Sequence, residues 1–120
     1  MARQSIVGDK SLAFAKRIAK LYRFLVDKKK ETIMSKQILR SGTSIGANIR
    51  EGLFAQSRKD FISKMNITLK EAGETDYWID LLFLFETIEQ HEYESLKNDL
   101  NIIIGTLIKV IKKTRDCQDE

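Results

Sequence analysis

Apolar side chains recur at every third or fourth position along most of the chain, which is the spacing of one face of an α-helix. Four stretches with this pattern, separated by short polar segments, predict helices at residues 9–29, 35–55, 57–89 and 92–113. Residues 1–8 are then expected to form a flexible N-terminal segment, and residues 114–120 a polar tail. Four helices with short connections are typical of an antiparallel up-down-up-down four-helix bundle, so we predict this all-α fold as a single domain.

The third predicted helix changes character near its end, in the run YWIDLLFLFETI at residues 77–88. Large apolar side chains occur there on nearly every side of the helix, with Asp80 as the main interruption. A helix that is apolar all round must be covered on more than one side. We therefore predict an oligomer interface at Trp78, Leu81 and Phe85. The alternative is a core helix that is buried by its own chain.

Three glycines occur among small polar residues in the segment RSGTSIGANIREG, at residues 40–52. Two interpretations compete: a phosphate-binding loop, and a helix that packs closely against a neighbour. A phosphate loop follows a β-strand, yet no strand pattern precedes Arg40, and the segment matches no nucleotide-binding motif. Glycine costs about 1 kcal/mol relative to alanine in a helix, and close packing at Gly42 and Gly46 would offset that cost. The helix interpretation is therefore favoured.

A narrow polar seam, formed by Ser44, Asn48 and Glu51, lies beside the apolar face of this helix. Convergent hydroxyl, amide and carboxylate groups can orient a ligand or a partner protein. They can also form an internal hydrogen-bond network that sets the register of neighbouring helices, which is the commoner situation for half-buried polar groups. We favour the structural interpretation and keep the binding site as the alternative.

Charge is distributed unevenly along the chain, although the net charge is only +4. Residues 1–64 carry 15 lysines and arginines against 5 acidic residues, whereas residues 65–108 carry 2 against 9. This asymmetry indicates either a basic surface for a polyanion or two complementary faces that meet in an assembly. The basic side chains that we predict to contact RNA or DNA phosphates are Lys16, Arg17, Lys20, Arg23, Lys28, Lys29, Lys30, Lys109, Lys112, Lys113 and Arg115.

Few residues offer catalytic or metal-binding chemistry. Cys117 is the single cysteine, which excludes an intrachain disulfide. The only histidine, His91, lies in a predicted turn, and the sequence has no Glu-x-x-His pair of the kind found in di-iron bundles. We therefore expect no enzymatic activity, no cofactor and no metal site. The apolar runs are too short for a signal peptide or a membrane span, so we expect a cytoplasmic protein without membrane contact.

The segment SIGANIREG, followed by QSRKDFISKMNITLKEAGETDYWIDLL, resembles the bacterial four-helix-bundle proteins that are encoded within intervening sequences of 23S rRNA genes. Arg50 departs from the family motif, NIAEG, which has a small residue at that position. The resemblance implies a homopentameric ring, similar to the accessory protein of diversity-generating retroelements, which binds nucleic acid and a reverse transcriptase. The residues that carry the resemblance are Arg40, Ser44, Ile45, Asn48, Ile49, Glu51, Gly52, Ser57, Asp60, Phe61, Glu71, Ala72, Glu74, Thr75, Trp78 and Leu82.

Two functional hypotheses follow from these patterns. The first is a non-enzymatic oligomer that binds RNA or DNA through its basic surfaces. The alternative is a homo-oligomeric protein-protein interaction scaffold without a nucleic-acid role. In the scaffold, the basic face pairs with a neighbouring subunit or with a separate acidic protein partner. A pentamer is the oligomer that the family resemblance implies.

Overall fold

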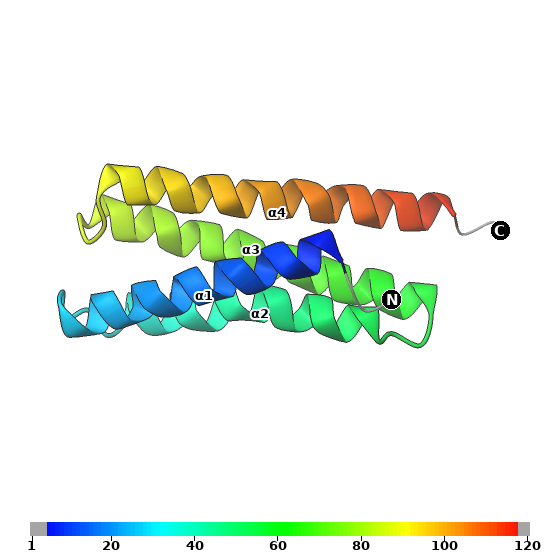
Figure 1. Cartoon of the computed structure of the whole chain (residues 1–120), viewed down its shortest axis with the longest axis horizontal. Helices are drawn as coiled ribbons and strands as arrows, with labels where there is room; N and C mark the ends of the chain where they lie inside the picture. The colour runs from blue at the N-terminus through cyan, green and yellow to red at the C-terminus, as the bar shows by residue number, and fades with distance from the viewer. Residues whose placement is uncertain (1–4, 118–120) are drawn as a thin grey trace.

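The computed structural model describes residues 5–117 and contains, within that range, four helices and no strand. Successive helices run in opposite directions and pack against each other, and α1 also contacts α4, so the four close into a bundle (Figure 1). The bundle measures 52 × 21 × 20 Å. The predicted all-α up-down-up-down fold is confirmed. The helices are α1 (Ile6–Asp27), α2 (Met34–Leu53), α3 (Arg58–Leu84) and α4 (Gln90–Asp116).

The helical part of the chain extends further at both ends than the sequence predicts. α1 begins three residues early, at Ile6, because the Ser5 side chain caps the helix by accepting a hydrogen bond from the Gly8 N–H at 2.8 Å. α4 continues to Asp116, three residues beyond its predicted end. Parts of the predicted flexible segment and of the predicted polar tail are therefore helical. The residues of those two segments that lie outside the described range are 1–4 and 118–120.

Helix α3 ends at Leu84, five residues before its predicted end, because the chain turns there. Glu86 adopts a left-handed conformation with φ 60°, and the Thr87 N–H donates a hydrogen bond to the Leu82 carbonyl at 3.0 Å. This bond closes the last turn of many helices, although glycine usually occupies the left-handed position. Apolar spacing continues through the turn to the buried Ile88, so periodicity alone does not reveal where the helix stops.

The connection between α1 and α2 is held by its own hydrogen bonds. Lys30 has a φ of 57°, and the Glu31 N–H after it donates to the Leu25 carbonyl at 2.9 Å. The Glu31 carboxylate accepts hydrogen bonds from three successive backbone N–H groups at the start of α2, at 2.7 to 3.1 Å. A carboxylate in this position satisfies donors that have no partner within the helix and suits the positive end of the helix dipole.

The core is one continuous apolar cluster between the four helices. Gly42 and Gly46 lie where α2 meets α1. A Cβ added at Gly42 would lie 3.0 Å from two carbons of Ile18, and one at Gly46 would lie 3.3 Å from the Ser11 Oγ. Both glycines are in the interior of α2, so the helix interpretation of residues 40–52 is confirmed. The largest fully buried side chains are Phe14, Ile18, Leu25, Ile38, Ile45, Ile49, Met65, Ile79, Leu82, Leu96, Leu100 and Ile103.

Candidate interaction surfaces

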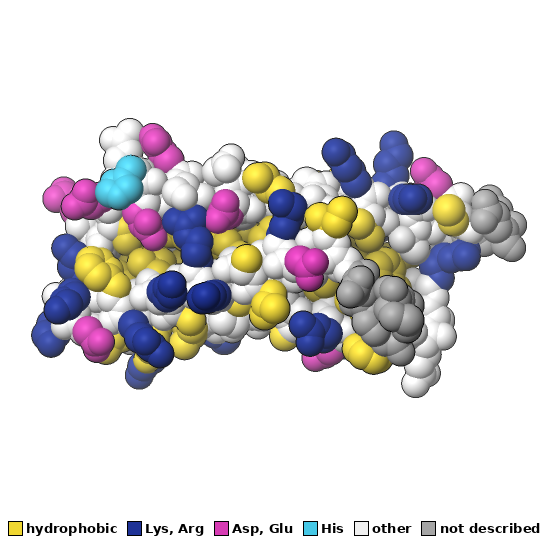
Figure 2. Space-filling view, viewed as in Figure 1, with side chains coloured by type: hydrophobic (Ala, Val, Ile, Leu, Met, Phe, Trp, Pro, Cys, Tyr) yellow, Lys and Arg dark blue, Asp and Glu magenta, His cyan; other side chains and the backbone are white. Residues whose placement is uncertain are grey.

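A row of basic side chains, which we call the α1 stripe, consists of Lys16, Lys20 and Arg23. Their spacings of four and three residues place them on one face of α1, and all three are exposed. Within the described residues, none of them forms an ion pair. The exposed Lys28, Lys29 and Lys30 follow at the end of the helix, and Figure 2 shows basic side chains gathered over this part of the molecule.

Arg17 has a different role from its neighbours in the sequence, because its guanidinium links α1 to α4. Its Nη1 lies 2.8 Å from an Asp99 carboxylate oxygen and 2.9 Å from the Ser95 Oγ, and its Nη2 lies 3.5 Å from Glu92. The α1–α4 contact is the sparsest of the four helix contacts, so this cross-link is an important part of it. Arg17 is thus engaged within the chain.

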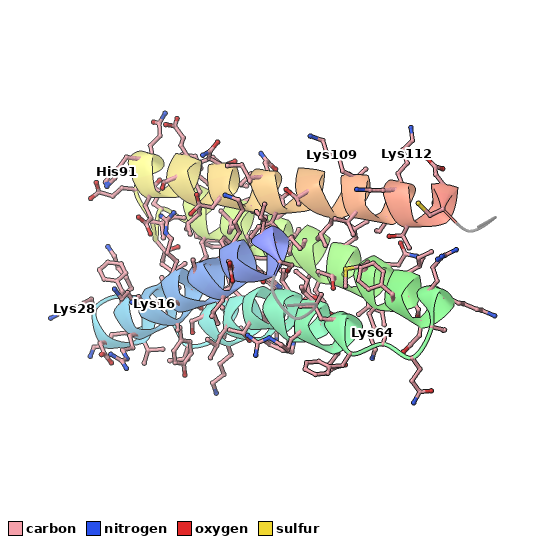
Figure 3. The ribbon with its side chains drawn as sticks, turned by 45° about the vertical axis from the view of Figure 1, so that its right-hand side comes forward. Lys16, Lys28, Lys64, His91, Lys109 and Lys112 are labelled. Carbon is pink, nitrogen blue, oxygen red and sulfur yellow. The ribbon has the colours of Figure 1, made fainter. Side chains whose placement is uncertain are left out.

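A second basic cluster lies on the last turns of α4. Lys109, Lys112, Lys113 and Arg115 are exposed, and none forms an ion pair within the part of the chain that the structure describes. In Figure 3, Lys109 and Lys112 lie in the opposite half of the bundle from Lys28. The predicted basic residues therefore form two separate surfaces.

The acidic side chains of α3 are mostly neutralised within the chain. Arg40 of α2 pairs with Glu71, at 3.3 Å, and with Glu74. Lys97 of α4 lies 2.6 Å from Asp76 and 2.7 Å from Asp80. Hydrogen bonds from Arg40, and then from the Trp78 indole, lower the pKa of Glu74.

The pKa of Asp80 responds to two opposing effects. Burial acts to raise it, but hydrogen bonds from Lys97 and from the Tyr93 hydroxyl, at 2.7 and 2.8 Å, outweigh burial and lower the pKa. The pKa of Lys97 is raised, because its bonds to Asp76 and Asp80 outweigh its own desolvation. These side chains join α3 to α4. They leave few unpaired acidic side chains on this face of α3 that a partner could bind.

The polar seam makes its contacts within the chain. The Asn48 side-chain amide donates to the Ser44 carbonyl at 2.9 Å, and Glu51 pairs with Lys64 of α3 at 2.9 Å. Ser44 and Asn48 are half-buried. These contacts support the structural interpretation of the seam.

The C-terminal half of α3 exposes apolar side chains that its own chain does not cover. We call this surface the α3 outer face; it consists of Gly73, Tyr77, Leu81 and Leu84, together with Phe85 immediately after the helix. Tyr77 is 57% exposed, Leu84 74% and Phe85 66%, whereas Leu81 is half-buried. A Cβ added at Gly73 would meet nothing within 4 Å. A contiguous exposed apolar face of this kind is more often an interaction site than a surface that stays in contact with solvent.

Trp78, which we predicted at the oligomer interface, is half-buried beside this face. Its indole Nε1 donates to Glu74 at 3.0 Å, and the ring packs edge-on against Tyr77. Tyr77 and Leu84 are more exposed, and the sequence interpretation missed both. The signal was present, because residues 73, 77 and 84 are separated by four and seven positions and share a helix face.

The described residues contain no group of three or more acidic, histidine or cysteine side chains that could hold a metal ion. His91 lies in the first turn of α4, not in the turn that the sequence predicts; it is 83% exposed, and its Nδ1 lies 3.8 Å from Glu89. Among the described helices, none is both long and apolar enough to cross a membrane.

A family model described as 23S rRNA-intervening sequence protein matches residues 3–109 of the chain. The chain belongs to this family. A crystal structure of a protein of unknown function from the S23 ribosomal protein family of Bacteroides thetaiotaomicron VPI-5482 is 62% identical in sequence. That structure matches with a TM-score of 0.88, over 89% of this chain and 96% of that chain. No protein with a curated description matches the chain.

Several of the residues that carry the resemblance to the 23S rRNA-intervening sequence family form one connected cluster in the structure. Arg40 bonds to Glu71 and Glu74, and Trp78 bonds to Glu74. Nearby, the Thr75 hydroxyl donates to the Ser41 Oγ at 2.9 Å in the buried contact between α2 and α3. Much of the sequence signature therefore fixes the α2–α3 pair.

Proposed function

We propose that this member of the 23S rRNA-intervening sequence family is a non-enzymatic, cytoplasmic homo-oligomer that binds RNA or DNA. The α1 stripe would contact the phosphate backbone. The observation that carries the proposal is that three adjacent cations are exposed and unpaired within the described residues, while Arg17 beside them and most acids of α3 are paired. Unpaired cations in a row are the feature that polyanion binding requires.

The geometry of the α1 stripe favours contact with the backbone over recognition of bases. Lys16 and Arg23 are seven residues apart, which is about 10 Å along a helix and covers roughly three base pairs of duplex. Phe24, the exposed aromatic residue next to the stripe, has the Lys29 ammonium 5.8 Å from its ring centre. It is one ring, not a row on which successive bases could stack. In an assembly of several copies, the weak phosphate contacts of each copy would act together and increase the overall affinity for the nucleic acid.

The proposal is tested by fluorescence anisotropy with structured 23S rRNA fragments and duplex DNA across a salt series. Three phosphate contacts per copy give a slope of log K against log salt of about −2.7 on duplex DNA. The variant K16E/K20E/R23E should weaken binding and flatten this slope. The matched control K109E/K112E/K113E reverses the same number of charges at the other end of the bundle and should weaken binding less. Absence of binding at low salt contradicts the proposal.

The second candidate function is a homo-oligomeric scaffold without a nucleic-acid role, which the α3 outer face favours. Exposed apolar side chains on one side of each bundle suit a ring in which two different faces meet, and five copies are expected from the family resemblance. Light scattering measures the mass of the assembly. Leu84→Glu should lower that mass, whereas Ile108→Glu, at an apolar side chain exposed on α4, is the matched control. A monomeric wild-type chain contradicts the oligomer in both candidate functions.

A further inference from the structure

A hollow of about 530 Å³ lies at the end of the bundle that carries the α1–α2 and α3–α4 turns. We call this end, residues 28–33 and 85–89, the closed end. The floor of the hollow is apolar and includes Phe24, which is 42% exposed. One wall comes from α1 and is basic; the other comes from the α3–α4 turn and is acidic. The charged side chains that line these walls include Lys20, Lys29, Glu86, Glu89 and Glu92.

The two walls carry opposite charges that barely pair with each other. Among the described residues, the one ion pair that crosses the hollow joins Arg17 to Glu92, at 3.5 Å. Lys29 and Glu86 form no ion pair within the described range, and Glu89 has only His91, at 3.8 Å. Along the middle of α3, by contrast, the acids are paired at 2.6 to 3.3 Å. The closed end thus keeps cations and anions side by side but largely unpaired.

Both walls are held in place by the turns that carry them. The Glu31 N–H bonds to the Leu25 carbonyl after Lys30, and the Thr87 N–H bonds to the Leu82 carbonyl after Glu86. These bonds fix the backbone of each turn. The two turns therefore cannot move toward each other without breaking the hydrogen bonds at a helix end. With the turns held in these positions, the exposed charges of both walls are available to groups from outside the chain.

We propose that the closed end of one copy binds the closed end of a second copy, related by a twofold axis that is perpendicular to the long axis of the bundle and runs between the two turns. The twofold operation places the basic turn of each copy, Lys28 to Lys30, against the acidic turn of the other, Glu86 to Glu89. A surface that carries both charges side by side is self-complementary under this symmetry. Phe24 and Ile33, the latter 76% exposed, contribute apolar area to the same contact.

The chemistry of the closed end fits a second copy better than a nucleic acid. A polyanion that approached Lys28 to Lys30 would also meet Glu86 and Glu89, which repel phosphate. An acidic or basic protein partner would match only one of the two turns. The second copy supplies both charges in the required arrangement. This contact is independent of the proposed ring: it would join two rings end to end, or two single chains if no ring forms.

Charge-reversed variants test the contact. K28E/K29E/K30E has a closed end that is acidic throughout, and E86K/E89K has one that is basic apart from Glu31, which caps α2. Sedimentation velocity at low salt should give wild type twice the mass of either variant alone, because like charges repel in each variant pair. An equimolar mixture of the two variants should recover the wild-type mass. Raising the salt to about 1 M should shift wild type toward the lower mass, since screening weakens the charge pairs.

Equal masses for wild type and both variants overturn the proposal, as does a mixture of the variants that does not recover the larger mass. Thermal melting of each variant, followed by circular dichroism, establishes that it is folded before its mass is compared. E86K/E89K also separates this contact from the proposed function. It retains the α1 stripe, so its RNA binding should be at least as tight as that of wild type while the twofold contact is lost.

Discussion

Gly42 of α2 and Gly73 of α3 are both interior helical glycines, but they lie in opposite surroundings. Gly42 is enclosed by Ile18 of α1, so its missing side chain lets two helices approach. Gly73 faces open space and has no packing reason within the chain. Each glycine costs its helix about 1 kcal/mol relative to alanine. The fold explains that cost at Gly42, whereas at Gly73, on the α3 outer face, no contact within the chain explains it.

The largest effect is expected from Gly42→Ala. Alanine gains helix propensity, but its Cβ would lie 3.0 Å from two carbons of Ile18, a fully buried and β-branched side chain that cannot easily rotate away. Overpacking should dominate and lower the free energy of unfolding by about 2 kcal/mol, as measured by urea denaturation. Gly105→Ala, where the added Cβ meets nothing within 4 Å, should be stabilising. A Gly42→Ala variant as stable as wild type would contradict close packing here.

A smaller effect is expected on the inner face of α3, from Thr75→Val. Valine keeps the shape and burial of the side chain but removes the hydroxyl that bonds to Ser41 Oγ across the α2–α3 contact. The loss should lower the free energy of unfolding by about 1 to 2 kcal/mol. The control is Thr106→Val, which removes only a bond to the Ile102 carbonyl of its own helix and should change stability by less than about 0.5 kcal/mol. Equal losses in the two variants would show that the cross-helix bond contributes little.

Gly73→Ala tests the other half of the comparison. Because the position is open, alanine should stabilise the dissociated chain by up to about 1 kcal/mol, measured at low protein concentration. If the α3 outer face lies against a neighbouring copy, the same substitution should lower the mass of the assembly in light scattering. Gly105→Ala should stabilise to a similar degree without changing that mass. An assembly unaffected by Gly73→Ala would place the subunit contact elsewhere.

The smallest effect is expected from pH, through Glu74 and Asp80, which join α3 to its neighbours. The folded chain lowers the pKa of both carboxyl groups, so their stabilisation is present above the pKa of the unfolded chain, near 4. It is lost as the pH falls through the lower, folded pKa. Both groups are more than a third exposed, so each should contribute less than about 1 kcal/mol. Glu74→Gln should flatten the dependence of unfolding free energy on pH below about 4.5.

The fold and the packing glycines could be predicted because helical periodicity records which face of each helix is buried. Other features depend on contacts that no periodic pattern contains. The end of α3 depends on Glu86 in a conformation that usually calls for glycine. The spacing of basic residues on α1 does not reveal that Arg17, and not Lys16 or Lys20, lies within reach of α4. On α3, by contrast, the spacing of residues 73, 77 and 84 does indicate the exposed face, although the sequence interpretation placed the half-buried Trp78 there.

The sparse contact between α1 and α4 also has a consequence for the order of folding. The other three helix contacts join neighbours in sequence, and α2 with α3 is the most extensive. Local contacts form early because little chain must be ordered to close them, whereas α1 and α4 come from distant parts of the chain. We expect the α2–α3 hairpin to form first and α1 to dock on α4 last. Amide hydrogens along that junction should then exchange with solvent sooner than those between α2 and α3.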